Sequence, residues 1–142
     1  MKRLYLSLLV VLSLLTLASG GAPRVTTLSG AEEVPPADPD GTGFAAITLN
    51  VGQGRVCWEL SVSNILPAAA AHIHAAPAGV NGGIVVTLSP PTTGSSSGCA
   101  SADPALIQAI IDHPELYYVN VHNAEFPGGA VRGQLSNRGQ SR

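Results

Sequence analysis

Three histidines occur in patterns that suit a shared metal site. His72 and His74 flank Ile73, so in an extended segment both imidazoles project from the same face of one strand. His122 ends a second β-prone run, residues 117–122, on the face opposite the aliphatic alternation of that run. Imidazole is the commonest metal ligand in proteins. We therefore predict that His72, His74 and His122 bind one divalent metal ion.

The expected ion follows from the ligands that the chain offers. Three imidazoles with an open coordination position suit Cu(II) or Zn(II), so copper or zinc is the expected cofactor. The only methionine is Met1, at the start of the chain, which leaves few soft ligands for a Cu(I) carrier. The alternative is that the three histidines are hydrogen-bonding residues at the end of a β-sandwich, because sequence alone does not place their two strands side by side.

Charged residues near these histidines have competing roles. Glu125 closely follows His122 and could accept a hydrogen bond that fixes an imidazole tautomer, or could be a plain loop carboxylate. Arg132 could lie beside an anion at the open position of the metal. We favour instead an ion pair between Arg132 and Glu32 or Glu33, which would tie the first loop to the last strand.

The first 22 residues have the three parts of an export signal. Met1–Arg3 is basic, Leu4–Leu17 is apolar, and small residues at positions 18–22 offer a cleavage site. The apolar run is shorter than the ~20 residues that a membrane-spanning helix needs. We therefore predict a signal peptide over residues 1–22 and a mature protein that is secreted or periplasmic, with no membrane partner after cleavage.

The mature chain would be mildly acidic. Lys2 and Arg3 leave with the signal, so five of the seven basic residues remain against nine acidic ones, and the formal net charge becomes −4. This balance offers no basic patch for nucleic acid, which we exclude as a partner. Charged residues make up only 11% of the chain, which is rich in Gly and Pro, and this composition suits a compact β domain with tight turns.

Cys57 and Cys99 are the only two cysteines of the chain. In an oxidising compartment an isolated pair is most simply a disulfide, and no CxxC spacing supports a redox or metal-binding pair. In the chain-entropy model a bridge that closes a loop of ~40 residues stabilises the protein by roughly 3–4 kcal/mol. The sequence therefore predicts a Cys57–Cys99 disulfide.

Short β-prone runs at regular spacing indicate an all-β, antiparallel sandwich over residues 23–136. One run alternates inward residues around Trp58, which should anchor the core, and a Gly-X-Gly turn at 52–54 should join it to the preceding run. The segment 90–98, rich in Ser, Thr, Gly and Pro, reads as an exposed loop. The expected strands are residues 24–28, 43–51, 55–65, 71–74, 84–88, 117–122 and 130–136, and residues 137–142 form a flexible polar tail.

One short helix interrupts this pattern. Asp103 is a strong N-cap residue and Pro104 a favoured first helical residue, while Pro114 marks the end. An apolar stripe between them has helical spacing. His113, the fourth histidine, falls at the C-terminus of this helix, so we expect it to be a cap or surface residue rather than a ligand.

Four ordered blocks of the chain resemble the CHRD domain family: LSGAEEVPP (28–36), AHIH (71–74), YYVNVH (117–122) and FPGGAVRGQL (126–135). The resemblance covers about Arg24 to Ser136 and implies an antiparallel, Greek-key-like β-sandwich, in single secreted bacterial domains as well as in repeats. The His-Ile-His block is also similar to the copper-ligating strand of Cu,Zn superoxide dismutases. This chain has no further His-rich loop that could supply the bridging imidazole and the zinc ligands of that enzyme.

Two functions from different classes remain. The first is a secreted binding or structural domain that carries copper or zinc without turnover, together with a protein partner that the sequence does not identify. The second is a small secreted copper enzyme that acts on superoxide or another small oxidant. Such an enzyme gains from a positive surface that steers its substrate, which a net charge of −4 does not supply globally. A Ser-His-Asp hydrolase lacks its nucleophile motif here. We favour the non-enzymatic domain.

Overall fold

The computed structural model describes residues 20–137. The predicted signal peptide and C-terminal tail therefore lie almost wholly outside the described residues. Within the described range, no helix is both long enough and apolar enough to cross a membrane.

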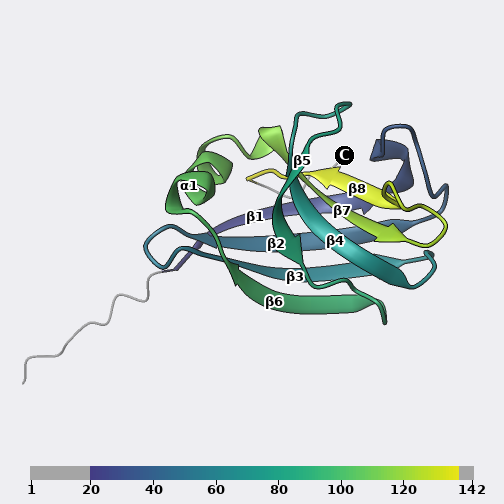
Figure 1. Ribbon diagram of the computed structural model, residues 1–142, viewed down its shortest axis with the longest axis horizontal. Coiled ribbons are helices and arrows are strands. Elements are labelled where there is room, and N and C mark those ends of the chain that lie inside the picture. Colours follow the sequence, from purple (N-terminus) through teal and green to yellow (C-terminus); the bar gives the residue numbers. More distant parts are fainter. Residues whose placement is uncertain (1–19, 138–142) are drawn as a thin grey trace, which may run out of the picture.

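Eight antiparallel strands of the described chain form one sheet that nearly closes on itself (Figure 1). Their order across the sheet is β5-β4-β7-β8-β1-β2-β3-β6. The strands are β1 (Ala22–Ser29), β2 (Thr42–Asn50), β3 (Arg55–Ser63), β4 (Ala68–Ala75), β5 (Gly83–Leu88), β6 (Ser95–Ser101), β7 (Tyr117–Asn123) and β8 (Val131–Gln134).

The sheet consists of two four-stranded halves that face each other. They join where β1 meets β8, through the pair Ser29 and Arg132 and the single bridge between Val25 and Ser136. The two edge strands, β5 and β6, come into contact on the other side. Strands β3 and β6, and likewise β4 and β7, are neighbours although they are not consecutive, as in Greek-key connections. The predicted all-β sandwich with one short helix is confirmed.

The core lies between the two halves and follows the alternation of the strands. In β3, Val56, Trp58 and Leu60 point inward and are at most 6% exposed, which confirms the expected role of Trp58. The turn between β2 and β3 has the predicted form, because Gly54 takes a φ of +58° and the Asn50 side chain accepts a hydrogen bond from the Gln53 backbone. The two strands therefore stay in register along their whole length.

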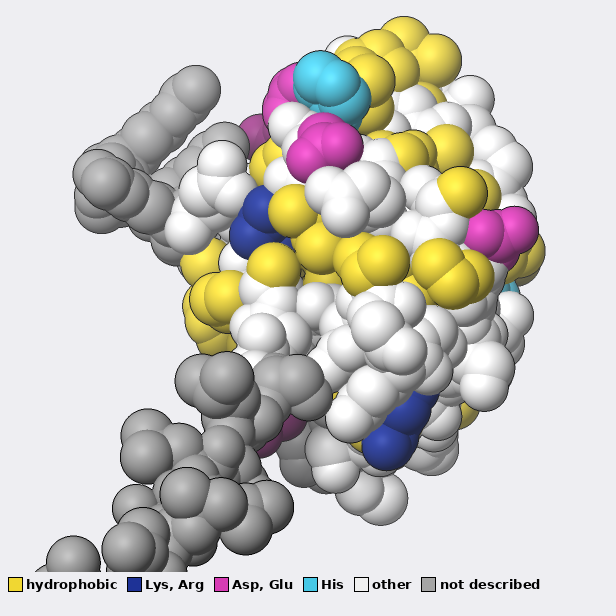
Figure 2. All heavy atoms as spheres, turned by 90° about the vertical axis from the view of Figure 1, so that its left-hand side faces the viewer, with side chains coloured by type: hydrophobic (Ala, Val, Ile, Leu, Met, Phe, Trp, Pro, Cys, Tyr) yellow, Lys and Arg dark blue, Asp and Glu magenta, His cyan; other side chains and the backbone are white. Residues whose placement is uncertain are grey.

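Helix α1 (Pro104–Asp112) covers one end of the core, next to β2 and β3 (Figure 1). The Asp103 side chain accepts a hydrogen bond from the Ala105 backbone, as expected of an N-cap. Ile107 and Ile110 are fully buried, so the apolar stripe faces the core. Figure 2 views the molecule from this end, where the basic side chains are few and separated.

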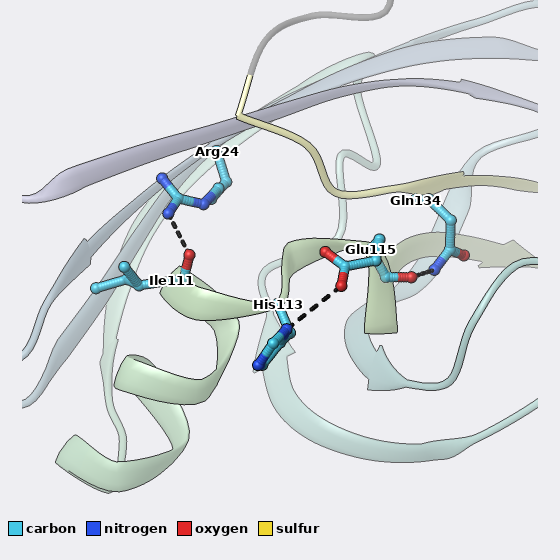
Figure 3. Close-up of polar contacts among 5 residues, drawn as sticks. All are labelled: Arg24, Ile111, His113, Glu115 and Gln134. Atoms are coloured by element: carbon cyan, nitrogen blue, oxygen red, sulfur yellow. Dashed lines mark hydrogen bonds and ion pairs between the residues drawn. The ribbon is translucent and has the colours of Figure 1, made fainter.

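The C-terminus of α1 is fixed by polar contacts (Figure 3). The Arg24 guanidinium donates a hydrogen bond of 2.5 Å to the carbonyl of Ile111, near the negative end of the helix dipole. His113 is the C-cap residue and lies 3.4 Å from the carboxylate of Glu115, with both side chains about two-thirds exposed. This position confirms that His113 belongs to the helix end and the surface.

The prediction of a loop over residues 90–98 is wrong in its second half. Residues from Ser95 onward form β6, an edge strand that pairs with β3 along seven positions. Serine and glycine have low β-propensity, so the sequence of this segment does not predict a strand. The strand forms because β3 offers it an unpaired edge and because Cys99 lies directly opposite Cys57. The two cysteines form the predicted disulfide.

Candidate metal centre

The register of two neighbouring strands brings the three histidines to one face. Strand β4 pairs with β7 so that His72 lies opposite Asn120, and His122 lies opposite Ala70. Residues directly opposite each other project to the same side of a sheet. His72, His74 and His122 therefore share one face, and the condition that sequence left open, the adjacency of the two strands, is met.

The three imidazoles converge. One ring nitrogen from each lies within 4.8 Å of the others, and the ring centroids are 5.0 to 6.2 Å apart. Bonds of ~2.0–2.1 Å from nitrogen to the ion allow two ligand nitrogens to be at most about 4 Å apart, so small side-chain rotations would complete the site. Residues 20–137 contain one group of three or more His, Cys, Asp or Glu side chains with such geometry, and it is this one.

Hydrogen bonds to backbone carbonyls determine the tautomers of two of the rings. Nδ1 of His74 lies 2.9 Å from the carbonyl of Gly82, and Nδ1 of His122 lies 3.0 Å from that of Pro127. A carbonyl can only accept, so both Nδ1 atoms carry the proton and both Nε2 atoms present a lone pair. Nε2 of His122 accepts from Nδ1 of His72, whereas Nε2 of His74 is buried without any partner.

An unpartnered buried nitrogen is unusual, because a buried polar atom without a hydrogen bond destabilises the fold. A metal ion between the rings would give Nε2 of His74 the partner that it lacks. Carbonyl acceptors on the far nitrogen are also the arrangement that orients metal-binding histidines in proteins. The residues present therefore fit a three-imidazole ion site.

The surroundings of His72 and His122 favour the neutral form of these two rings. Burial, followed by the neighbouring His122 and His74, lowers the pKa of His72 from 6.5 to about 4. Burial also lowers the pKa of His122, and the hydrogen bond to Pro127 only partly opposes this shift. Only the neutral imidazole binds a metal, so both shifts favour binding at neutral pH.

The face of the sheet that carries the three histidines is largely buried, although it is opposite the aliphatic face of β7. Tyr118 and Asn120, which share this face of β7, are each only 2% exposed, and His74 is 8% exposed. The loop between β4 and β5 contributes to this cover, since the Gly82 backbone donates a hydrogen bond to the Tyr118 hydroxyl. The sheet thus has a second, polar interior beneath this loop.

The favoured ion pair of Arg132 with Glu32 or Glu33 is not present. Among the described residues no carboxylate lies within ion-pair distance of Arg132. The guanidinium instead donates hydrogen bonds to the carbonyls of Pro77 and Val80, at 3.1 and 2.9 Å, and to the side chain of Asn81 at 3.3 Å. Arg132 is 1% exposed, so it does not face solvent as an anion-binding residue would. It also donates to the side-chain oxygen of Gln134, so its acceptors are two backbone carbonyls and two neutral amide side chains, and none is a carboxylate.

Glu33 shares the polar interior with Arg132 without touching it. Burial raises the pKa of Glu33 from 4.5 to about 7, although the charge of Arg132 and a hydrogen bond from Asn120 act in the opposite direction. The carboxyl packs against Gly129, where a Cβ atom would come within 2.3 Å of it. Glu32, by contrast, is exposed.

Glu125 is exposed, and the acceptor on His122 is the carbonyl of Pro127. The structure therefore assigns to a backbone group the role that sequence offered to Glu125. The contacts of Gly82 and Pro127 could not be found from sequence, since any residue carries a carbonyl. Tyr118 could be found from the sequence, because the alternation of the strand places it on the same face as His122.

Comparison with known families finds a match that covers most of the chain. The model of a family described as the CHRD domain matches residues 24–135, from within β1 to just past β8, and so includes the three histidines. No curated protein and no solved structure matches the chain.

Proposed function

The chain belongs to the CHRD domain family, and on this premise we propose that it is a secreted domain that binds one copper or zinc ion through His72, His74 and His122 without catalysing a reaction. The observation that carries the proposal is the convergence of three imidazole nitrogens within 4.8 Å. The unpartnered Nε2 of His74 supports it, since it presents a desolvated lone pair to the same point.

The ligand set supports Cu(II) or Zn(II) over other ions. Three neutral imidazoles suit both ions and leave a position for water or for a ligand from a partner. The two cysteines are joined in a disulfide and provide no thiolate. Carboxylates, which hard ions such as Ca²⁺ and Mg²⁺ require, are missing from the group.

Two features support a location outside the cytoplasm. The Cys57–Cys99 disulfide is consistent with an oxidising compartment. The basic and apolar start of the chain has the composition of an export signal.

The test is metal analysis of protein secreted without an affinity tag, followed by titration of the metal-free form with Cu(II). We expect one ion per chain and an electron paramagnetic resonance spectrum with coupling to three imidazole nitrogens. His72→Ala and His122→Ala should each weaken binding strongly. His113→Ala, which removes the exposed histidine at the helix end, is the matched control and should leave binding unchanged. Equal binding by all variants would contradict the site.

A copper enzyme is the second candidate, because His72 and His122 are partly exposed and so leave the ion within reach of small molecules. Against it, the buried Arg132 provides no accessible positive charge beside the ion. Superoxide removal by the copper-loaded protein, compared with His72→Ala, distinguishes the two functions. Turnover that depends on His72 would favour the enzyme.

A further inference from the structure

His74 is held differently from the other two histidines. Its ring is stacked on that of Tyr118, with centroids 4.8 Å apart and planes 3° from parallel. Its Nδ1 contacts the carbonyl of Gly82. Together these contacts determine both the plane of the ring and the nitrogen that carries the proton.

Tyr118 contacts both partners of this arrangement. Besides the stack with His74, its hydroxyl accepts a hydrogen bond of 3.2 Å from the backbone nitrogen of Gly82. The same peptide segment therefore donates to Tyr118 and accepts from His74. A side chain at position 82 would collide with the Ala75 carbonyl, at 2.0 Å from the added Cβ, so only glycine allows this close approach.

Arg132 fixes the other side of Tyr118. Strand β7, which carries Tyr118, lies between β4 with His74 and β8 with Arg132. The guanidinium carbon of Arg132 lies 3.4 Å from the centroid of the Tyr118 ring, and the guanidinium Nη2 donates to the carbonyls of Pro77 and Val80. A cation over an aromatic ring attracts it more strongly when both are shielded from water, as here.

We propose that Tyr118, packed between Arg132 and His74, is a positioning residue that sets the tautomer and ring orientation of His74 and so presents Nε2 to the metal. Arg132 acts through Tyr118 and through the loop that carries Gly82. Without this support the loop and its carbonyl would shift, and His74 could rotate or carry its proton on Nε2, where it blocks ligation. The second part of this inference, presentation to the metal, rests on the proposed function.

The tautomer can be measured without any metal. Long-range proton–nitrogen NMR correlations of the metal-free protein distinguish a proton on Nδ1 from one on Nε2. We expect His74 to carry it on Nδ1 in the unmodified protein. Tyr118→Phe removes the bond to Gly82 but keeps the stack, Tyr118→Leu removes both, and Arg132→Lys shortens the reach to the loop carbonyls. Each should give a mixture of tautomers at His74.

Two matched controls distinguish a positioning role of Tyr118 and Arg132 from a general loss of stability. Tyr117→Leu changes the adjacent tyrosine, which packs against the apolar core from the opposite face of β7. Arg24→Lys changes another buried arginine that binds backbone carbonyls, here those of Pro23 and Ile111. Both should leave the His74 tautomer unchanged, whatever they cost in stability.

Copper titration then tests the link to the metal. Loss of a residue that orients a ligand typically weakens metal binding by 10–100-fold, so we expect a change of about that size for Tyr118→Leu, with fewer than three imidazoles coupled to Cu(II). Folded Tyr118 and Arg132 variants with an unchanged tautomer and unchanged affinity would overturn the inference. If Tyr118→Leu does not fold, Tyr118→Phe decides. A mixture of His74 tautomers in the variants of a protein that binds neither copper nor zinc would sustain the positioning role and overturn the proposed function.

Discussion

Nδ1 of His72 lies 3.1 Å from Nε2 of His122, although the two residues are 50 positions apart in the chain. Because Nδ1 of His122 already donates to Pro127, the hydrogen between the two rings belongs to His72. An ion that takes both nitrogens as ligands replaces this hydrogen, and the proton of His72 moves to its other ring nitrogen. The metal-free protein thus keeps two ligand atoms together with one hydrogen bond.

The burial of His72 and its closeness to the other two histidines change the expected pH dependence of metal binding. An ordinary imidazole would lose its metal as the pH falls through about 6.5. Here burial first, and the neighbouring histidines second, lower the pKa of His72 to about 4. We therefore expect protonation of His72 to compete with Cu(II) binding only as the pH falls through about 4, and not already through about 6.5. Competition titrations with a chelator of known pH dependence measure this, and a midpoint near 6.5 would contradict it.

The disulfide should stabilise an edge of the sheet. Cys57 and Cys99 face each other across β3 and β6, and β3 is the only strand hydrogen-bonded to β6 in the described sheet. For a sequence separation of 42 the chain-entropy model gives about 4 kcal/mol. We expect Cys57→Ser with Cys99→Ser to lower the free energy of unfolding by roughly this amount, measured by urea denaturation. Alkylation of the unreduced protein should find no thiol, and two modified cysteines would refute the bond.

The sandwich could be predicted because its central strands carry their own signals. The alternation around Trp58 and the Gly-X-Gly turn before it are local, and both survive in the fold. Strand β6 could not be predicted, since its serines and glycine gain a strand conformation only from pairing with β3. Edge strands of this kind depend on tertiary contacts rather than on propensity.

The histidine cluster, too, could be predicted only in part from the sequence. The shared face of His72 and His74 follows from the period of a strand, and the phase of His122 follows from its own strand. What sequence could not provide was the register between β4 and β7 and the carbonyls that orient the rings. The burial of Arg132 also escaped prediction, because it depends on how the loop that follows β4 folds back over the sheet.

Glu33 should make the metal-free protein less stable as the pH rises. Its pKa is raised from 4.5 to about 7 by burial, so the folded state holds a proton that the unfolded chain has already released. The contribution of the Glu33 carboxyl to the free energy of unfolding is therefore fully present below about pH 4.5 and is lost as the pH rises through about 7. A shift from 4.5 to about 7 corresponds to at most about 3–4 kcal/mol. His72, whose pKa is lowered, acts in the opposite sense and destabilises the fold as the pH falls below about 6.5.

The two contributions can be separated by substitution. Glu33→Gln keeps the shape of the side chain but cannot ionise, so the free energy of unfolding should decrease less between pH 5 and about 8 than in the unmodified protein. Glu32→Gln is the matched control, because Glu32 is the neighbouring residue and is exposed. It should leave the pH dependence as it is. Urea denaturation of the metal-free proteins at several pH values measures all three, and equal slopes for Glu33→Gln and the unmodified protein would show that the buried carboxyl does not titrate in this range.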